Sequence, residues 1–212
     1  MAKLKNDNKE KLPIYYPIVI TLLVIFITIS GFLTIKKYIF KDPIVSMEET
    51  KLKTLGEAVT RNPDNVSVRL KLAYELQLLQ DFDQAKKQYL EALKLAPEDL
   101  AANYNLGAIA VEQKNYDEAE KYFTQTLALE PNHVLAAYGL GQMYFTQKEF
   151  DKVVDTVDPV LKSNPENASL HSLKAKSLEK LGKIMEAKTE YSTVLKYIPD
   201  DKDTNEALKR LK

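Results

Sequence analysis

The order of apolar and polar residues divides the chain into two parts. Residues 12–35 contain no charged side chain, and the run from Ile18 to Ile27 is apolar except for Thr21. A helix over residues 12–35 would be about 36 Å long, and the hydrocarbon core of a bilayer is about 30 Å thick. The pattern therefore predicts a transmembrane helix at 12–35, preceded by a polar, lysine-rich tail at 1–11.

Two other interpretations of the apolar segment are a buried core helix and a cleaved signal peptide. A core helix of this length normally carries a polar stripe, which is almost absent here. Thr28-Ile29-Ser30 loosely resembles a cleavage site, but the apolar run continues through 31–35 and then meets two lysines, which favours a retained anchor. Lysine counts on the two sides are balanced, and the short tail favours an inside N-terminus with the rest of the chain outside the cytoplasm.

From residue 66 onward the pattern recurs every 34 residues. A constant period of this length indicates stacked copies of one supersecondary unit. The copies cover residues 66–99, 100–133, 134–167 and 168–201. Proline precedes the first copy and recurs near the end of each one, at Pro63, Pro97, Pro131, Pro165 and Pro199.

Within each copy, small and large residues stand at fixed positions and predict a pair of helices of about 12–14 residues. Small residues let the paired helices approach closely, and large ones fill the wedge between successive pairs. Proline ends the second helix. The eighth position holds Ala73, Gly107, Gly141 and Ala175; the twentieth holds Ala85, Ala119, Val153 and Ala187; the twenty-fourth holds Tyr89, Phe123, Val157 and Tyr191.

Two residues interrupt this regularity. Lys174 occupies the seventh position, where the other copies have leucine. Pro159 falls within the second helix of the third copy, so we expect that helix to be kinked or split. Outside the copies, 36–65 is predicted to form a juxtamembrane link and a capping helix that starts near Ser46 and Glu49. Residues 202–212 are predicted to form a C-terminal capping helix.

The repeat pattern resembles the tetratricopeptide repeat, in which small residues occupy positions 8 and 20, an aromatic lies near 24 and proline stands at 32. The resemblance covers residues 66–201 in four registers. It implies an all-α protein, with four repeats forming a helical solenoid between capping helices, behind the transmembrane helix. The tryptophan common at position 4 is replaced by Arg69, Asn103, Ala137 and His171.

The resemblance also implies a binding surface, because positions 2, 5, 6, 9, 12 and 13 of the first helix line the concave face in this family. Aromatic rings interleaved with amides suit a bound peptide or helix, although some of the rings can instead pack within the protein. The family's clamp for a C-terminal carboxylate is absent, since Leu135 and Gly139 replace two of its cations. The predicted groove residues are Leu70, Tyr74, Gln77, Tyr104, Asn105, Ala108, Val111, Tyr138, Gln142, Phe145, Ser172, Lys176 and Lys180.

Charge and composition argue against several kinds of chemistry. Residues 42–212 carry 23 Lys and Arg against 28 Asp and Glu, without a basic stripe for nucleic acid. The chain has no cysteine, so disulfides, thiolate catalysis and covalent haem attachment are excluded. Neither His133 nor His171 has partners at metal-ligand spacing. Asp117, Glu118 and Glu120 open a helix, where acids favour the dipole. We therefore expect no enzyme, metal, cofactor or small-molecule substrate.

These observations predict a membrane-anchored scaffold that binds a partner protein in the repeat groove. Its layout resembles single-pass bacterial repeat proteins that assist the assembly of exported or membrane proteins. Two alternatives remain at this stage: a cytoplasm-facing membrane adaptor that recruits soluble partners, and an accessory subunit of a membrane complex.

Overall fold

The computed structural model describes residues 15–38 and 43–211, with side chains described for 21–32 and 47–211. Every described element is a helix, which confirms the predicted all-α class. The chain divides into two compact units. The first, Met1–Lys53, contains α1 (Tyr15–Tyr38) and the start of α2 (Pro43–Arg61), and the second, Thr54–Lys212, contains the remaining helices. The predicted tail at 1–11 lies outside the described residues.

The predicted transmembrane segment must be corrected. No helix in the described part of the chain is both long enough and apolar enough to cross a membrane. The prediction of a single-pass membrane protein with extracytoplasmic repeats is therefore wrong, and the predicted bilayer contact through residues 12–35 has no support in the described residues.

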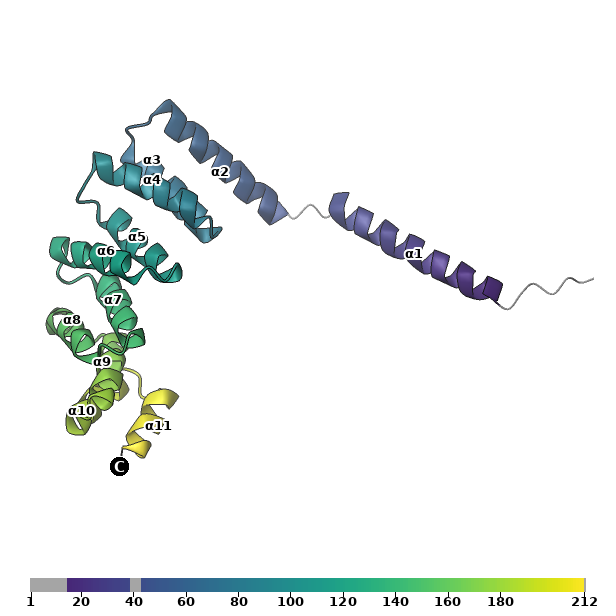
Figure 1. Ribbon diagram of the computed structural model, residues 1–212. Coiled ribbons are helices and arrows are strands. Elements are labelled where there is room, and N and C mark those ends of the chain that lie inside the picture. The colour runs from purple at the N-terminus through teal and green to yellow at the C-terminus, as the bar shows by residue number, and fades with distance from the viewer. Residues whose placement is uncertain (1–14, 39–42, 212) are drawn as a thin grey trace, which may run out of the picture. The chain divides into compact units, whose positions relative to one another are not determined.

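The second unit contains the predicted array of helix pairs, followed by α11 (Lys202–Arg210). Each pair has a first helix of 13 residues, here called helix A, and a second of 14, called helix B. The pairs stack in chain order, as Figure 1 shows for the teal to green segments. The A helices are α3 (Val66–Leu78), α5 (Leu100–Glu112), α7 (Val134–Thr146) and α9 (Ala168–Lys180); the B helices are α4 (Phe82–Leu95), α6 (Tyr116–Leu129), α8 (Phe150–Ser163) and α10 (Ile184–Tyr197).

The last position of each copy is a helix N-cap, which explains why short polar residues recur there. The side chain at this position accepts a hydrogen bond from a backbone N–H in the first turn of the next helix, at 2.8–3.1 Å. At the start of the third repeat the acceptor is Nδ1 of His133, the last residue of the second copy. Asn65 and Asn167, which also match glycosylation triplets, are caps as well. The five caps are Asn65, Asp99, His133, Asn167 and Asp201.

The turn between helices A and B also repeats. Position 15 has a positive φ of 58–75° in every copy, at Gln80, Lys114, Lys148 and Gly182. The following residue donates its backbone N–H to a carbonyl five residues earlier, as Asp81 does to Leu76 at 2.9 Å. This is the Schellman arrangement that ends a helix by satisfying its last carbonyls. Only the fourth copy uses glycine at the left-handed position.

Phe123 is the wedge between the second and third helix pairs. It is 2% exposed, and two glycines make room for its ring. A Cβ atom added to Gly107 of α5 would lie 2.8 Å from the ring, and one added to Gly139 of α7 would lie 2.8 Å from its Cζ. Gly141 instead faces Leu173 of the next helix A, at 2.9 Å, with Val157 and Val153 behind it. The predicted close approach of the paired helices is thus confirmed at Gly107, whose neighbour is Phe123 of α6, whereas the nearest neighbour of Gly141 lies on the next helix A.

Pro159 does not split its helix, because α8 runs without interruption from Phe150 to Ser163. Proline cannot donate a hydrogen bond to the carbonyl of Asp155, four residues earlier. Both Pro159 and Asp155 are exposed, so water can satisfy that carbonyl. The structure also starts the capping helix α2 at Pro43, three residues before the predicted Ser46, and a proline suits the first turn of a helix.

Two of the residues that replace the expected tryptophan at position 4, Arg69 and His171, bond to the turn before their helix. Arg69 donates from Nε to the carbonyl of Pro63 at 3.0 Å. His171 bonds through Nε2 to the carbonyl of Pro165 at 2.9 Å. In both cases the acceptor is the carbonyl of the proline that follows the preceding helix, so Arg69 and His171 hold the start of helix A to the turn before it.

Lys174 belongs to a half-buried ionic network at the third and fourth pairs. Its Nζ lies 2.7 Å from Asp158 of α8 and 2.7 Å from Glu190 of α10. The other carboxylate oxygen of Glu190 contacts Nδ1 of His171. Burial opposes the charge of Lys174, but its hydrogen bonds to the two acids outweigh that effect and raise its pKa. An ion network therefore occupies the space that leucine fills in the other repeats.

Three buried tyrosines predict a loss of stability in alkali. Burial raises the pKa of Tyr89, Tyr144 and Tyr191, and hydrogen bonds to Glu120 and Glu179 add to this for Tyr144 and Tyr191. The folded pKa is thus above that of an unfolded tyrosine, about 10. Their contribution to stability is complete below about pH 10 and is lost as the pH rises beyond it.

We expect the ionisation of these phenols, followed at 295 nm, to coincide with loss of helical circular dichroism. Tyr191→Phe should move the alkaline transition to higher pH, whereas Tyr197→Phe, at a side chain 39% exposed, should leave it unchanged. Complete ionisation of the tyrosines in a fully helical protein would contradict this prediction.

Candidate protein-binding groove

The A helices present one row of side chains at positions 2, 5, 9 and 12, and we call the surface formed by these rows the groove. At its N-terminal end, a cavity of about 530 Å³ lies between α3 and α5. Leu70 and Tyr74 are among its apolar lining residues, and Tyr74 is 49% exposed. The cavity is lined by Val66, Ser67, Leu70, Lys71, Tyr74, Glu75, Tyr89, Asp99, Ala101 and Asn105.

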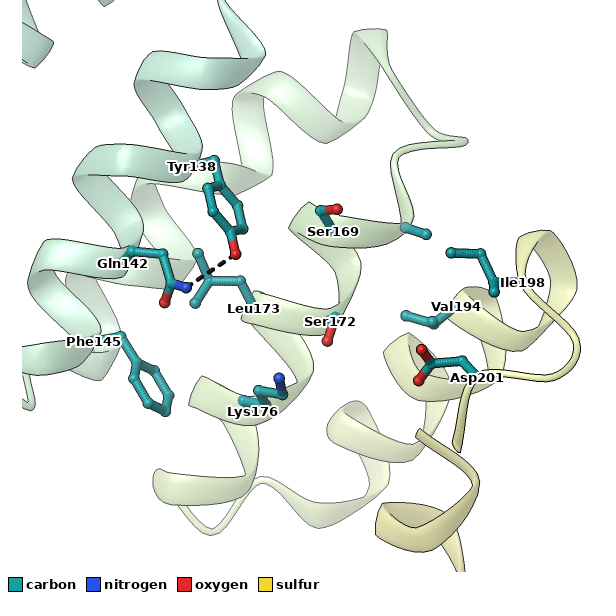
Figure 2. Close-up of a pocket in the computed structure, with 11 residues that line it drawn as sticks. Tyr138, Gln142, Phe145, Ser169, Ser172, Leu173, Lys176, Val194, Ile198 and Asp201 are labelled. Atoms are coloured by element: carbon teal, nitrogen blue, oxygen red, sulfur yellow. Dashed lines mark hydrogen bonds between the residues drawn. The ribbon is translucent and has the colours of Figure 1, made fainter. Parts of the chain in front are cut away.

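A second cavity, of about 380 Å³, lies between α7 and α9, and we call it the α7–α9 cavity. Figure 2 shows Tyr138, Gln142 and Phe145 on one side, with Val194 and Ile198 on the other. Helix α9 forms the floor through Ser169, Ser172, Leu173 and Lys176, and Ala168 and Asp201 complete the lining.

A third cavity, of about 350 Å³, lies between α9 and α11. Phe145 and Lys176 line both this cavity and the α7–α9 cavity, so they form a ridge between the two. Glu179 accepts hydrogen bonds from Arg210 at 2.7 and 2.9 Å and from the Tyr191 hydroxyl at 3.0 Å. Helix α11 is thereby fastened to the last repeat, and its acids Asp203 and Glu206 line the third cavity.

The aromatic residues predicted to bind a partner differ in how much they pack within the protein. Tyr104 lies 6.0 Å from Phe123 and 5.3 Å from His133, measured between ring centroids, and burial raises its pKa. Phe145 contacts Phe150 edge to face at 5.3 Å. Tyr138 is half-buried, and its hydroxyl accepts a hydrogen bond from Nε2 of Gln142 at 3.0 Å. The prediction that these rings bind a partner stays a prediction.

The other predicted groove residues also fall into different classes. Ala108 and Val111 are half-buried against the core. Gln77 accepts a hydrogen bond from the Tyr89 hydroxyl at 3.0 Å, so its side chain has a structural role. Lys176 and Lys180 are exposed, and neither forms an ion pair with another residue in the described part of the chain.

Sequence reasoning missed several lining residues that occupy position 2 of a helix A, although the family pattern includes that position. Ala101 lines the first cavity and Ser169 the α7–α9 cavity, and Leu135 stands at the equivalent position of α7 with 58% exposure. The contribution of α11 was also missed. Extending the 34-residue register past residue 201 would have placed Glu206 and Arg210 at groove positions.

The groove is apolar toward its N-terminal end and polar toward its C-terminal end. Apolar side chains dominate on α3, α5 and α7, whereas the row on α9 consists of Ser169, Ser172 and Lys176 followed by Glu179. Hydrogen bonds from Thr204 lower the pKa of Asp201, with a smaller effect from Lys176, so this carboxylate is charged and caps α11.

Two of the acids at the start of α6 have structural partners. Glu118 pairs with Lys86 at 2.6 Å, and Glu120 accepts a hydrogen bond from the Tyr144 hydroxyl at 2.7 Å. Within the described residues, no group of three or more histidine or acidic side chains could hold a metal ion.

Comparisons of sequence agree with this geometry. Two sequence profiles described as "Tetratricopeptide repeat" match residues 70–129 and 110–177, which together make about half of the chain. The chain belongs to the tetratricopeptide repeat family. Members of this family are generally non-catalytic scaffolds for protein interactions. No curated protein sequence matches this repeat protein at a significant level.

Solved structures of other repeat proteins share its fold. MamA aligns with a TM-score of 0.66 at 19% identity, covering 74% of this chain and 86% of MamA. YrrB, described as a repeat protein with an unusual peptide-binding site, aligns with a TM-score of 0.65 at 18% identity and coverages of 74% and 81%. PilF of Pseudomonas aeruginosa aligns with a TM-score of 0.67 at 20% identity and coverages of 78% and 76%. At these identities the likeness concerns the fold.

Proposed function

We propose that this repeat protein is a non-catalytic scaffold that holds an apolar peptide or helix of a partner protein in its groove and so assists assembly of a complex. One observation carries the proposal: the groove rows of α3 and α7 leave large apolar side chains in contact with solvent. Tyr74 is 49% exposed and lines the cavity of about 530 Å³, and Leu135 is 58% exposed on the groove row of α7.

The energetics of such a surface favour association. Exposed apolar area gains roughly 25 cal/mol for each Å² removed from water, and rigid aromatic rings lose little conformational entropy when they are covered. The helix pairs supply a stiff support, so the groove is formed before a partner arrives and less ordering is needed on binding. The peptide-binding site attributed to YrrB supports the proposal by analogy of fold.

A matched pair of substitutions tests the proposal. Leu135 and Met185 are both exposed, and each is the second residue of its helix, on α7 and α10 respectively. Aspartate is favourable near a helix N-terminus, so both replacements should preserve folding. We expect Leu135→Asp to weaken peptide binding at least tenfold and Met185→Asp to change it less than twofold.

The ligands for this test come from random twelve-residue peptides displayed with both ends tethered and selected on the immobilised full-length chain. Affinities of the enriched peptides are measured by fluorescence anisotropy, with circular dichroism as the check on folding. Failure to enrich any peptide, or equal losses from the two aspartate variants, would reject the groove as the binding surface.

A further inference from the structure

Three donors on the α9 side of the α7–α9 cavity share one feature, which is that no described protein group accepts a hydrogen bond from their side chains. Ser177 on α9 donates its hydroxyl to the carbonyl four residues earlier, at 2.9 Å. Ser169 and Ser172 on the same helix make no such bond to any described residue. Lys176 follows them one turn later and forms no ion pair in the described part of the chain. A row of three donors without a protein acceptor therefore forms the floor of the cavity.

Tyr138 adds a fourth donor from the opposite wall. Its oxygen accepts the hydrogen bond from Gln142, so the hydroxyl proton remains available for another acceptor. In Figure 2 this hydroxyl points from α7 into the space above Leu173. Apolar side chains complete the walls, because Phe145, Val194 and Ile198 also line the cavity.

The acid in the lining does not cancel this donor character. Asp201 accepts the backbone N–H of Thr204 at 2.8 Å and offsets the dipole of α11, so its charge is already engaged. The cavity consequently matches a group that accepts several hydrogen bonds, carries negative charge and is attached to an apolar neighbour. A carboxylate beside a bulky aliphatic or aromatic side chain has this chemistry.

We propose that the α7–α9 cavity selects partner segments in which an aspartate or glutamate side chain adjoins a bulky apolar residue, with the carboxylate bound by Ser172, Lys176 and Tyr138. This inference rests on the proposed function and specifies its ligand. The acid is an internal side chain, because the ridge of Phe145 and Lys176 has cavities on both sides and a bound chain can continue past it. The apolar neighbour packs against Phe145, Val194 and Ile198.

The test uses the selected peptides, whose two tethered ends leave no free terminal carboxylate. We expect the enriched sequences to contain Asp or Glu within three residues of Leu, Ile, Phe or Tyr. The best sequence is then synthesised with acetylated and amidated ends, alongside a version with Gln or Asn in place of the acid. Binding to the full-length chain should weaken at least tenfold when the acid is replaced.

The protein side of the test is a double-mutant cycle. Lys176→Met keeps the side-chain stem and removes the charge. This substitution should lower the affinity for the acidic peptide at least tenfold. It should lower the affinity for the amide version less than twofold. Lys162→Met, at an exposed lysine of α8, is the control and should leave both affinities within twofold. Raising the salt concentration should weaken binding of the acidic peptide but not of the amide version.

The outcomes separate this inference from the proposed function. Suppose that the selected peptides lose binding to Leu135→Asp, as the proposed function requires. If they then show no preference for an acid, or bind Lys176→Met as well as the native chain, the inference is overturned and the proposed groove function stands. A requirement for a free C-terminal carboxylate, seen when the peptide end is left unblocked, also overturns it. Failure to enrich any peptide contradicts both proposals.

Discussion

Gly107→Leu is expected to lower the free energy of unfolding by about 3 kcal/mol, because the new side chain would overlap the ring of Phe123. Even a single Cβ atom at this position would lie 2.8 Å from two ring carbons, and Gly139 constrains the ring from the other helix. The ring is 2% exposed and has no open space toward solvent. For a chain of this size the loss corresponds to roughly 6–12 °C in Tm.

Gly56 provides the control for Gly107. A Cβ atom added there, in helix α2, meets nothing within 4 Å. Gly56→Ala should therefore raise stability by about 0.5–1 kcal/mol through helix propensity, whereas Gly107→Ala should lower it. Urea unfolding of the full-length chain, followed by circular dichroism at 222 nm, measures both.

A second substitution identifies the cause of the Gly107 effect. Phe123→Leu shortens the side chain that the new Cβ atom would strike, so Gly107→Ala should cost less in the Phe123→Leu background than in the native one. If Gly107→Ala is as stabilising as Gly56→Ala, or if its cost is the same in both backgrounds, Gly107 is not a contact point for Phe123.

Lys174→Met is expected to lower the free energy of unfolding by about 2 kcal/mol, since it leaves two acids facing each other without their cation. Asp158 and Glu190 both lie 2.7 Å from the ammonium group, and the Glu190 side chain is only 14% exposed. Glu190→Gln removes one of the two charges, so the double variant should recover part of the loss. Urea unfolding of the four proteins in this cycle gives the coupling energy.

The control for burial is Lys94, which pairs with Glu91 at the same distance of 2.7 Å but with 69% and 37% of the two side chains exposed. Ion pairs at such exposure contribute about 0–1 kcal/mol, so Lys94→Met should be nearly neutral. A Lys174→Met protein as stable as Lys94→Met would show that the half-buried network does not stabilise the fourth repeat.

Much of the array could be predicted because its determinants are local and repeated. A small residue at position 8, a large one at position 24 and a proline at position 32 set how close two helices come and where the second one ends. Each repeat contacts mainly its neighbours, so one register specifies the whole stack. The N-caps belong to the same local class, because each cap accepts a hydrogen bond from a backbone N–H only three residues later, as Asn65 and Asn167 do.

The candidate site was predictable in position but not in detail. Family register placed Tyr138, Gln142, Phe145 and Lys176 on one surface, and the structure brings all four around one cavity. The register did not show that Tyr104 packs on Phe123, or that Gln77 is held by Tyr89. Those contacts depend on side-chain directions across two helices, which a one-dimensional pattern does not contain.

The sequence by itself determined the helix pairs, their period and the row of residues that faces the groove, since each follows from spacing along one helix or from a local cap. Only the tertiary structure decided which donors of the α7–α9 cavity have no protein acceptor. It also decided how Lys174 replaces a core leucine and how Arg210 and Glu179 hold α11 to the last repeat. The physical reason is that hydrogen-bond and ion-pair partners lie up to 32 residues apart along the chain, and stacking of the helix pairs alone brings them together.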